Sequence, residues 1–476
     1  MFARKWGLAL HAAPLSHPEN AGVARTDLFG HPKGLTVLFA TEMWERFSYY
    51  GMASLLVLYM VKYLLLPGQA ETVIGYRAVK GALETMFGPL AVQPLASQIF
   101  GFYAGFAYLL PVAGGYLADR FFGQRKMAIV GALLMAAGHF LMAIEAMLFI
   151  ALGLLVLGMG AFKPNVSTQV GSLYASNDPR RVRAYSIYYV GINIGALLAP
   201  LVAGTLGGEA GWHYGFAAAG VGMLISLAIY LGGLRHLPPD ERRPSAAARA
   251  AALPFDKRER LTIFGLVAVF LITALFWATY EQQSNTLMLW AEDFTERRID
   301  LGFWQGNIPT TWFLALNPLM IFVFAPVLIR MWAHQARRGT EMSTISKLAL
   351  AFFFVALANL LMAAAALMAN GGKASPLWLV GYFVIVTIGE LHLGPVGLAL
   401  VSQMAPARVL SLMMGLWLAA SFPGEILGGW LGGFWSSMEK VNFFFMIAAV
   451  AAGGGAAMLA LNPVLRSVFD EPANRA

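Results

Sequence analysis

Residues 34–63 read GLTVLFATEMWERFSYYGMASLLVLYMVKY, a long apolar stretch interrupted by a short charged motif. A helix needs roughly 20 mostly apolar residues to cross the hydrocarbon core of a bilayer. This stretch is long enough, and eleven later segments have the same character. The predicted spans are 34–63, 96–117, 127–145, 147–171, 184–205, 214–234, 261–288, 309–332, 346–369, 377–402, 409–434 and 441–463. The pattern predicts an all-α membrane protein with 12 transmembrane helices.

The composition of the chain favours a membrane protein over a soluble one. Of its 476 residues, 58% are hydrophobic and 12% are charged, whereas soluble domains carry about 25% charged residues. A soluble protein of this length could not bury so much apolar surface, so lipid must solvate much of it. The sequence has no cysteine, which excludes disulfides, a thiolate nucleophile and Cys-based metal sites.

The net charge of +8 comes from short loops between the apolar segments, so nucleic-acid binding is not expected. When residues near a span end are counted with the adjoining loop, seven of the 33 Lys and Arg residues fall on one side and 24 on the other, and two, Arg46 and Lys163, lie within spans. The seven are Lys62, Arg77, Lys80, Arg297, Arg298, Lys373 and Lys440. Because basic residues concentrate on the cytoplasmic side, we expect both termini in the cytoplasm. The small loops are typical of a multi-pass protein of a bacterial inner membrane.

The twelve spans divide into two groups of six. The longest cytoplasmic connection, 235–260, reads RHLPPDERRPSAAARAAALPFDKRER, which is polar and rich in Ala and Arg. Such a segment is suited to tether the two halves of a transporter. The expected parts are a cytoplasmic N-terminal segment 1–33, an N-terminal six-helix bundle 34–234, the linker 235–260, a C-terminal six-helix bundle 261–463 and a cytoplasmic tail 464–476.

Charged residues inside the spans are the main functional signal, because a charge at the bilayer centre costs at least about 2.5–3.5 kcal/mol. Four residues of the first span recur at spacings of three and four, and so share much of one helix face: Glu42, Glu45, Arg46 and Tyr49. Two acids and one base leave a local charge of −1, which Lys163 in the fourth span could balance. The cluster could switch with protonation, or it could only hold helices together.

Three more acids lie in apolar spans of the second half. Glu281 ends the run FWATYE with no basic neighbour in sequence, and it could bind a proton near neutral pH unless it lies in the hydrated interface. Glu390, in IGELHLGPVG, could pair with a substrate ammonium group in a polar cavity. Glu425, in SFPGEILGG, has Pro and Gly neighbours that favour a bent helix; its role stays open.

Polar and aromatic residues accompany these charged spans, as a binding cavity would require. They are Tyr49, Tyr50, Tyr108, Tyr188, Tyr189, Asn193, Trp277, Asn317, Trp417 and Ser421. Each could instead join helices by packing or hydrogen bonding. Their association with the charged spans favours the cavity.

The segment GYLADRFFGQRK, residues 115–126, connects the second and third spans. Its pattern G-x3-D-R-x2-G-x-R-K is formed by Gly115, Asp119, Arg120, Gly123, Arg125 and Lys126. The glycines permit a tight turn, and Asp119 could cap a helix or pair with an arginine. The pattern closely resembles the cytoplasmic loop motif of the major facilitator superfamily, which implies that fold.

Six segments together resemble one family of that superfamily, the proton-dependent oligopeptide transporters, over roughly residues 31–430. They are TEMWERFSYYG, FKPNVSTQVGSLY, YSIYYVGINIGA, FWATYEQQ, IPTTWFLALNPL and GELHLGPVGL. The first resembles the family motif E-x-x-E-R-F-x-Y-Y-G. The third resembles F-Y-x-x-I-N-x-G, with Tyr188 where Phe is usual. The resemblance implies a proton-coupled symporter of di- and tripeptides that works by alternating access.

The resemblance also implies a role for each matched residue. The proton-coupling set would be Glu42, Glu45, Arg46, Lys163 and Glu281. The peptide's amino terminus would lie at Glu390 and Asn317, its backbone at Asn193 and Tyr108, and its side chains near Trp277, Trp417 and Ser421. Tyr49, Tyr50 and Lys163 would complete the substrate site, with Lys163 near the peptide carboxylate.

The sequence departs from the family pattern at several positions. Ala53 stands where many members carry an arginine that helps to hold the substrate carboxylate, so that carboxylate would depend on Lys163 and Arg46. Gly101 stands where animal relatives carry a histidine, and Glu425 where an amide is more usual. The linker is too short for the two extra helices of many bacterial members.

Other functions stay open at this stage. A carrier of the same fold could take a non-peptide substrate, such as an amino-acid conjugate, a nitrate-like anion or a drug, and a passive channel or receptor would not depend on a proton gradient. A membrane-embedded enzyme is disfavoured, because the sequence has no H-E-x-x-H or G-x-S-x-G motif. We expect a monomer in the lipid bilayer, with protons as the coupling ion and neither cofactor nor metal.

Overall fold

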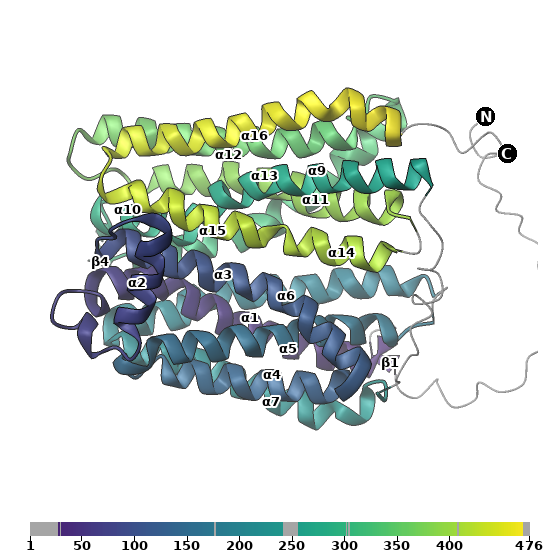
Figure 1. The fold of residues 1–476 in the computed structure, drawn as a ribbon, viewed down its shortest axis with the longest axis horizontal. Helices are drawn as coiled ribbons and strands as arrows, with labels where there is room; N and C mark the ends of the chain where they lie inside the picture. Colours follow the sequence, from purple (N-terminus) through teal and green to yellow (C-terminus); the bar gives the residue numbers. More distant parts are fainter. Residues whose placement is uncertain are drawn as a thin grey trace, which may run out of the picture.

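The computed structural model describes residues 27–28, 30–175, 178–240, 256–300, 302, 305–406 and 409–469. Helices make up nearly all of it, as Figure 1 shows. Nine helical stretches of these residues are long and apolar enough to cross a membrane. Most of the predicted N-terminal segment, the central part of the predicted linker and residues 470–476 lie outside the described residues.

The first six predicted spans are all helical. They are α1 (Lys33–Tyr59), α3 (Val92–Leu117), α4 (Gln124–Leu141), α5 (Leu148–Ser172), α6 (Arg180–Thr205) and α7 (Trp212–Gly233). Two of them are not among the nine apolar stretches: α1, which contains Glu42, Glu45 and Arg46, and α4, which begins with a polar turn that includes Arg125 and Lys126.

The last six predicted spans are helical as well, and two of them are broken. The helices are α9 (Lys257–Tyr280), α11 (Leu316–Arg338), α12 (Thr344–Ala369), α13 (Leu377–Met404), α14 (Leu410–Ala419), α15 (Ser421–Gly432) and α16 (Lys440–Phe469). The predicted span 409–434 becomes α14 and α15 around Pro423, which has no N–H to donate within a helix. The predicted span 261–288 ends as α9 at Tyr280 and continues as a 3-10 turn, η7 (Glu281–Ser284), and helix α10 (Thr286–Asp293).

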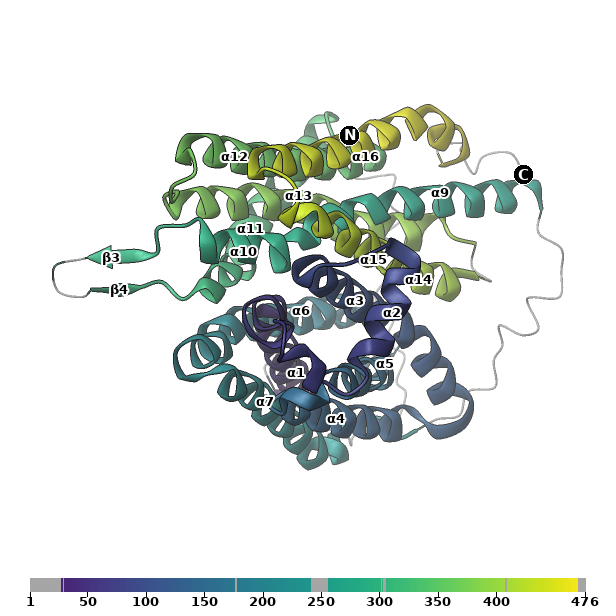
Figure 2. The same cartoon turned by 60° about the vertical axis from the view of Figure 1, so that its left-hand side comes forward.

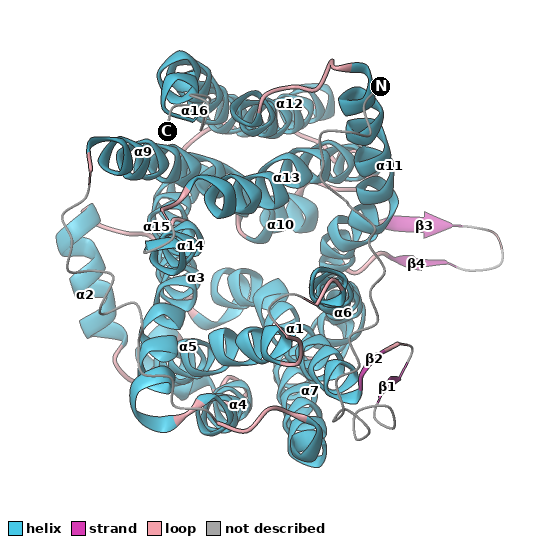
Figure 3. Cartoon of the chain, turned by 90° about the vertical axis from the view of Figure 1, so that its right-hand side faces the viewer, coloured by secondary structure: helices cyan, strands magenta, loops and turns pink. Residues whose placement is uncertain are grey.

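The helices form two bundles of six spans, the arrangement of the major facilitator superfamily. Figure 3 shows α1 and α3 to α7 on one side and α9 and α11 to α16 on the other. In the first group α1 packs on α6 and α7, and in the second α12 packs on α13 and α16. The groups meet where α3 packs on α15 and where α6 packs on α11 and on the 3-10 turn η8 (Thr310–Ala315). The predicted domain boundaries stay predictions; α16 runs to Phe469, past residue 463.

Small elements cover one end of the bundles. They are helix α2 (Tyr76–Phe87), helix α10 and the antiparallel strands β3 (Arg298–Asp300) and β4 (Gln305–Asn307), in which Ile299 lies opposite Gly306. Figure 2 shows that this hairpin projects from the helices. We call this end the α10 end. The opposite end, which holds the π-helical turn η3 (Ala118–Phe122) and the short strands β1 (Asp27–Leu28) and β2 (His31–Pro32), is called the η3 end.

Candidate functional site

A cavity of about 170 Å³ lies between the two bundles. Its walls come from α1, α3 and α6 on one side and from α9, η7, η8, α11 and α13 on the other. Seven residues predicted to bind substrate line it: Tyr49, Tyr50, Tyr108, Asn193, Trp277, Asn317 and Glu390. Ala53 and Glu281 line the same cavity. Residues more than 300 positions apart in sequence therefore share one small chamber.

The carboxylate of Glu390 is held in a fixed direction by its own bundle. The Tyr280 hydroxyl and the Asn317 amide Nδ2 each donate to Glu390 Oε2, at 2.7 Å. Asn317 Nδ2 also lies 3.1 Å from the Thr387 hydroxyl oxygen. Both bonds to Glu390 end on the same oxygen, so Oε1 accepts no hydrogen bond from the described residues. A ligand ammonium group would find there a charged acceptor, the strongest kind of partner for an N–H donor.

Glu281 lies on the same wall of the cavity, one helical turn after Trp277. No basic nitrogen of the described chain lies within 4.0 Å of its carboxylate. Glu390 is near enough for the two carboxylates to repel each other when both are ionised. This wall therefore carries two acids and no paired cation, which makes it suited to receive positive charge.

The opposite wall is rich in tyrosine. The rings of Tyr49 and Tyr50 meet edge to face with centroids 5.1 Å apart, and Tyr103 stacks behind Tyr49 at 6.5 Å. Asn193 Nδ2 donates to the backbone oxygen of Tyr189, at 2.9 Å, which fixes the amide on α6. Phenol and amide groups of this kind can hydrogen-bond a polar ligand without adding charge.

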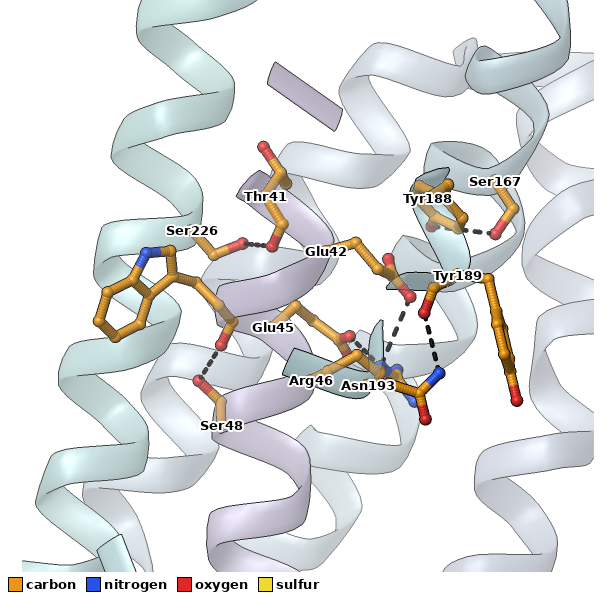
Figure 4. A network of polar contacts seen from close by, with 11 residues as sticks. Thr41, Glu42, Glu45, Arg46, Ser48, Ser167, Tyr188, Tyr189, Asn193 and Ser226 are labelled. Atoms are coloured by element: carbon orange, nitrogen blue, oxygen red, sulfur yellow. Dashed lines mark hydrogen bonds and ion pairs between the residues drawn. The ribbon is translucent and has the colours of Figure 1, made fainter. Parts of the chain in front are cut away.

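Helix α1, which contributes to this wall, also carries the predicted charged cluster, shown in Figure 4. Arg46 makes a two-point ion pair with Glu45, with Nε–Oε2 at 2.5 Å and Nη2–Oε1 at 2.6 Å. Its Nε also lies 3.5 Å from Glu42 Oε1, and its guanidinium lies 5.1 Å from the centroid of the Tyr49 ring. The three charged side chains are at most 3% exposed. A buried ion pair is destabilised strongly when one partner is lost, so this cluster is sensitive to any change of charge.

The backbone around the cluster is tied to α7. Ser226 Oγ donates to the Thr41 carbonyl at 2.7 Å, and Ser48 Oγ donates to the Ala219 carbonyl at 2.7 Å. Figure 4 shows the Ser226–Thr41 contact on the side of α1 that faces away from Tyr188 and Tyr189. The helix that carries the charged side chains is thus hydrogen-bonded to α7.

Lys163 does not join this ion-pair network by direct contact. Its Nζ lies 4.6 Å from the centroid of the Tyr108 ring, and no acid in the described part of the chain lies within 4.0 Å of it. The expected balancing of charge is therefore electrostatic at longer range, since Glu42 and Glu45 still act on Lys163. The Tyr108 ring gives the cation an alternative partner.

Two residues predicted to line side-chain pockets are not on the cavity wall. Trp417 is 5% exposed and packs against Phe270, with ring centroids 5.7 Å apart. Ser421 is buried at the first position of α15. The structure brings neither residue to the chamber that holds Glu390.

Sequence reasoning missed several residues of the site. Tyr280 and Thr387 hold the Glu390 and Asn317 side chains, and Ser284 lines the cavity. A signal for two of them existed, because Trp277, Tyr280, Glu281 and Ser284 are spaced three and four residues apart and share one face. Thr387 had the same kind of signal, since it precedes Glu390 by three residues on α13, although its contact with Asn317 depends on how α11 packs against α13.

Polar contacts between the bundles lie only at the α10 end, among the residues that the structure describes. One is an ion pair, Lys62 Nζ to Asp293 Oδ1 at 2.5 Å. Ser97 Oγ donates to Asn285 Oδ1 at 2.8 Å, and Trp312 Nε1 donates to Thr205 Oγ1 at 2.7 Å. The remaining contacts are Gln93 with Gly432 and Ser436, and Thr311 with Pro200. An ion pair and several hydrogen bonds therefore hold the bundles together, or fasten them, at this end of the cavity.

The predicted loop motif forms the turn between α3 and α4. Gly123 has φ = +85°, a conformation that requires glycine in practice, and Arg120 stacks on the Tyr116 and Phe121 rings. Arg125 donates from its guanidinium to three backbone carbonyls at 234, 237 and 238. The motif thus attaches the α3–α4 turn to the segment that follows α7. Asp119 makes no ion pair with the described residues within 4.0 Å.

Two helical bundles around a central polar cavity that is fastened at one end define a multi-pass membrane transporter. Comparison with known proteins agrees with this class. The chain is 34% identical over 474 residues to the peptide transporter YePEPT of Yersinia enterocolitica, covering 85% of this chain and 88% of that protein. It is 31% identical over 490 residues to a di-/tripeptide transporter of Lactococcus lactis subsp. cremoris, covering 90% and 94%.

A solved structure of a mutant of the peptide transporter POT in complex with alafosfalin is 32% identical and superposes with a TM-score of 0.80. That match covers 94% of this chain and 98% of the solved one. The model of the POT family matches residues 125–255 and 255–447. This chain belongs to the POT family.

Proposed function

We propose that this protein is a proton-coupled symporter that imports di- and tripeptides by alternating access. The observation that carries the proposal is the cavity between the bundles, in which Glu390 presents an unpaired carboxylate oxygen beside Tyr280 and Asn317. A peptide ammonium group would bind there. The family membership and the names of the relatives support peptides as the substrate class.

The protein would lie in the inner membrane as a monomer, with both termini in the cytoplasm and the α10 end outside. This orientation rests on the distribution of Lys and Arg. The fastened α10 end then corresponds to a carrier closed to the outside. Opening would require the Lys62–Asp293 and Ser97–Asn285 contacts to separate.

Proton entry would supply the energy for uptake. Glu281 and the cluster of Glu42, Glu45 and Arg46, with Lys163 nearby, would bind and release the coupling protons. Moving one charge inward is worth about 2.3 kcal/mol per 100 mV of membrane potential. No cofactor or metal enters this mechanism, and no enzymatic activity is proposed.

The test is uptake of labelled dialanine into proteoliposomes with and without an inward proton gradient. We expect accumulation that requires the gradient and that unlabelled di- and tripeptides inhibit. Absence of uptake by correctly folded protein would contradict the proposal.

A non-peptide substrate on the same fold is the second candidate. It is favoured by Ala53, which lines the cavity where many family members carry an arginine for the substrate carboxylate. If amino-acid conjugates, nitrate-like anions or drugs are accumulated while di- and tripeptides do not compete, this candidate replaces the first.

A further inference from the structure

Glu425 is a buried acid for which the proposed mechanism has no use. It is 2% exposed and lies on the face of α15 that packs against α3. The two backbones are close here: a Cβ atom added at Gly101 would lie 2.6 Å from the Glu425 carbonyl oxygen, and one at Gly105 would lie 3.5 Å from the Glu425 Cβ. Helices approach so closely only through small residues. Glu425 is thus enclosed by a contact between the two bundles.

The side chain of Glu425 has no cation to balance a negative charge. Its Oε1 is buried and without a hydrogen-bond partner. The titratable groups that face it are Tyr49 from α1, Tyr108 from α3 and Glu281 from η7. The only charged member of this set is another acid. No basic nitrogen in the part of the chain that the structure covers lies within 4.0 Å.

An ionised carboxylate in this position would have an unfavourable free energy, because an isolated buried charge loses its hydration without compensation. A protonated carboxyl group loses far less. Hydrogen bonds also join the bundles beside the α3–α15 contact, since Gln93 on α3 donates to the Gly432 carbonyl and Ser97 on α3 donates to Asn285 Oδ1 at 2.8 Å. When the bundles separate at this end, water would reach the carboxyl group and the ionised form would become stable.

We propose that Glu425 is a proton-binding site at the α3–α15 contact, and that closure of the α10 end requires one proton to bind there. The proton comes from the solution on the α10 side and converts the carboxylate to a carboxyl group. No other bond changes. This inference rests on the proposed alternating access, and it adds a proton site to those of Glu281 and the α1 cluster.

The test measures conformation without peptide, so it does not depend on the substrate. Because the chain has no cysteine, spin labels can be attached at Glu209→Cys and Lys373→Cys, two exposed positions of opposite bundles at the α10 end. Pulsed electron spin resonance then gives the ratio of closed to open molecules in lipid nanodiscs as a function of pH. By linkage, the slope of the logarithm of this ratio against pH counts the protons bound on closure.

We expect Glu425→Gln to reduce this slope by about one proton, so that the closed population persists at high pH. The same reduction should appear in the Glu281→Gln background. Glu425→Asp keeps a carboxyl group and should keep the slope. Glu439→Gln, a change of an exposed acid at the same end, is the matched control and should leave the slope unchanged.

An unaltered slope in Glu425→Gln would overturn the inference, provided that Glu425→Asp shows the same distances as the parent protein. If the slope falls as expected but no di- or tripeptide is transported, the proton site stands and the proposed substrate fails. If peptide uptake is normal and the slope does not change, only the proton site fails.

Discussion

Among the single residues of the cavity, Glu390 has a carboxylate that two hydrogen bonds hold in place. Tyr280 and Asn317 both bind the same carboxylate oxygen, at 2.7 Å, and leave the other for a ligand. The constraint removes the cost of ordering the acid when an ammonium group binds. Binding of an ammonium group by Glu390 therefore depends on the charge of the carboxylate and needs no rearrangement of its side chain.

Glu390→Gln should lower the affinity for dialanine by roughly tenfold or more, because hydrogen bonds to charged groups are worth about 1.5–3 kcal/mol. The amide can still bond to Tyr280 and Asn317, so the fold should be retained. Inhibition of uptake by dialanine and by N-acetyl-dialanine would be compared. The acetylated peptide should lose little further affinity in the variant, and an unchanged preference for the free amine would contradict the assignment.

Glu281→Gln should abolish uptake driven by a proton gradient, since the variant cannot bind a proton at this position. Exchange of labelled for unlabelled peptide without a gradient should survive, because the rest of the cavity wall is intact. Both activities would be measured in the same proteoliposome preparation. Driven uptake at the parent rate would assign Glu281 a structural role only.

The residue scale also shows where sequence reasoning fails. Glu281, Asn317 and Glu390 were predicted because each is a polar residue within an apolar span, and all three line the cavity. The partner of Lys163 could not be predicted in the same way. It depends on where α3 places the Tyr108 ring, 4.6 Å from Lys163 Nζ, and no spacing within α5 contains that information.

At the scale of elements, the contact between α3 and α15 determines how tightly the α10 end can close. Gly101 is indispensable there, since an added Cβ would lie 2.6 Å from a backbone carbonyl oxygen and 3.0 Å from the Cα of Gly429. Neither atom can move aside as a flexible side chain could. A single methyl group should therefore keep the two helices apart.

Gly101→Ala should reduce peptide uptake and increase the open population at the α10 end. Gly153→Ala is the matched control, because a Cβ at that position of α5 meets no atom within 4 Å. Uptake and the spin-label distance between positions 209 and 373 would be measured for both variants. If the two variants behaved alike, close approach at Gly101 would not be needed for closure.

Secondary structure was predictable for long apolar helices and less so for short ones. The span 261–288 was expected to be continuous, yet Asn285 has φ = −114° and ψ = −97° and separates η7 from α10. Its polar neighbours at 282–284 indicate a break, but the apolar run that follows conceals it. Helix α2 was missed because it is amphipathic and buries only Leu83.

At the scale of the whole molecule, the sequence predicted twelve spans in two halves because lipid limits spanning segments to apolar helices. The lengths of the apolar segments and the position of the longest polar connection were sufficient for this prediction. The relation between the bundles could not be predicted, since a carrier of this class has more than one arrangement. The fastening at the α10 end is information that only the structure provides.

The predicted orientation of the molecule can be tested with reporter fusions. Green fluorescent protein fused to the C-terminus should fluoresce, and alkaline phosphatase at the same point should be inactive, because the tail is expected in the cytoplasm. Alkaline phosphatase inserted after Lys373 should be active. The reverse result at both points would invert the topology and place the α10 end inside.

The location of the described polar contacts between the bundles at the α10 end has a pharmacological consequence. An antibody fragment that bridges the β3–β4 hairpin and the loop after α6 would act as a clamp across this end. It would immobilise the carrier without entering the substrate chamber. Its inhibition would be non-competitive, so that no amount of nutrient peptide in the medium could relieve it.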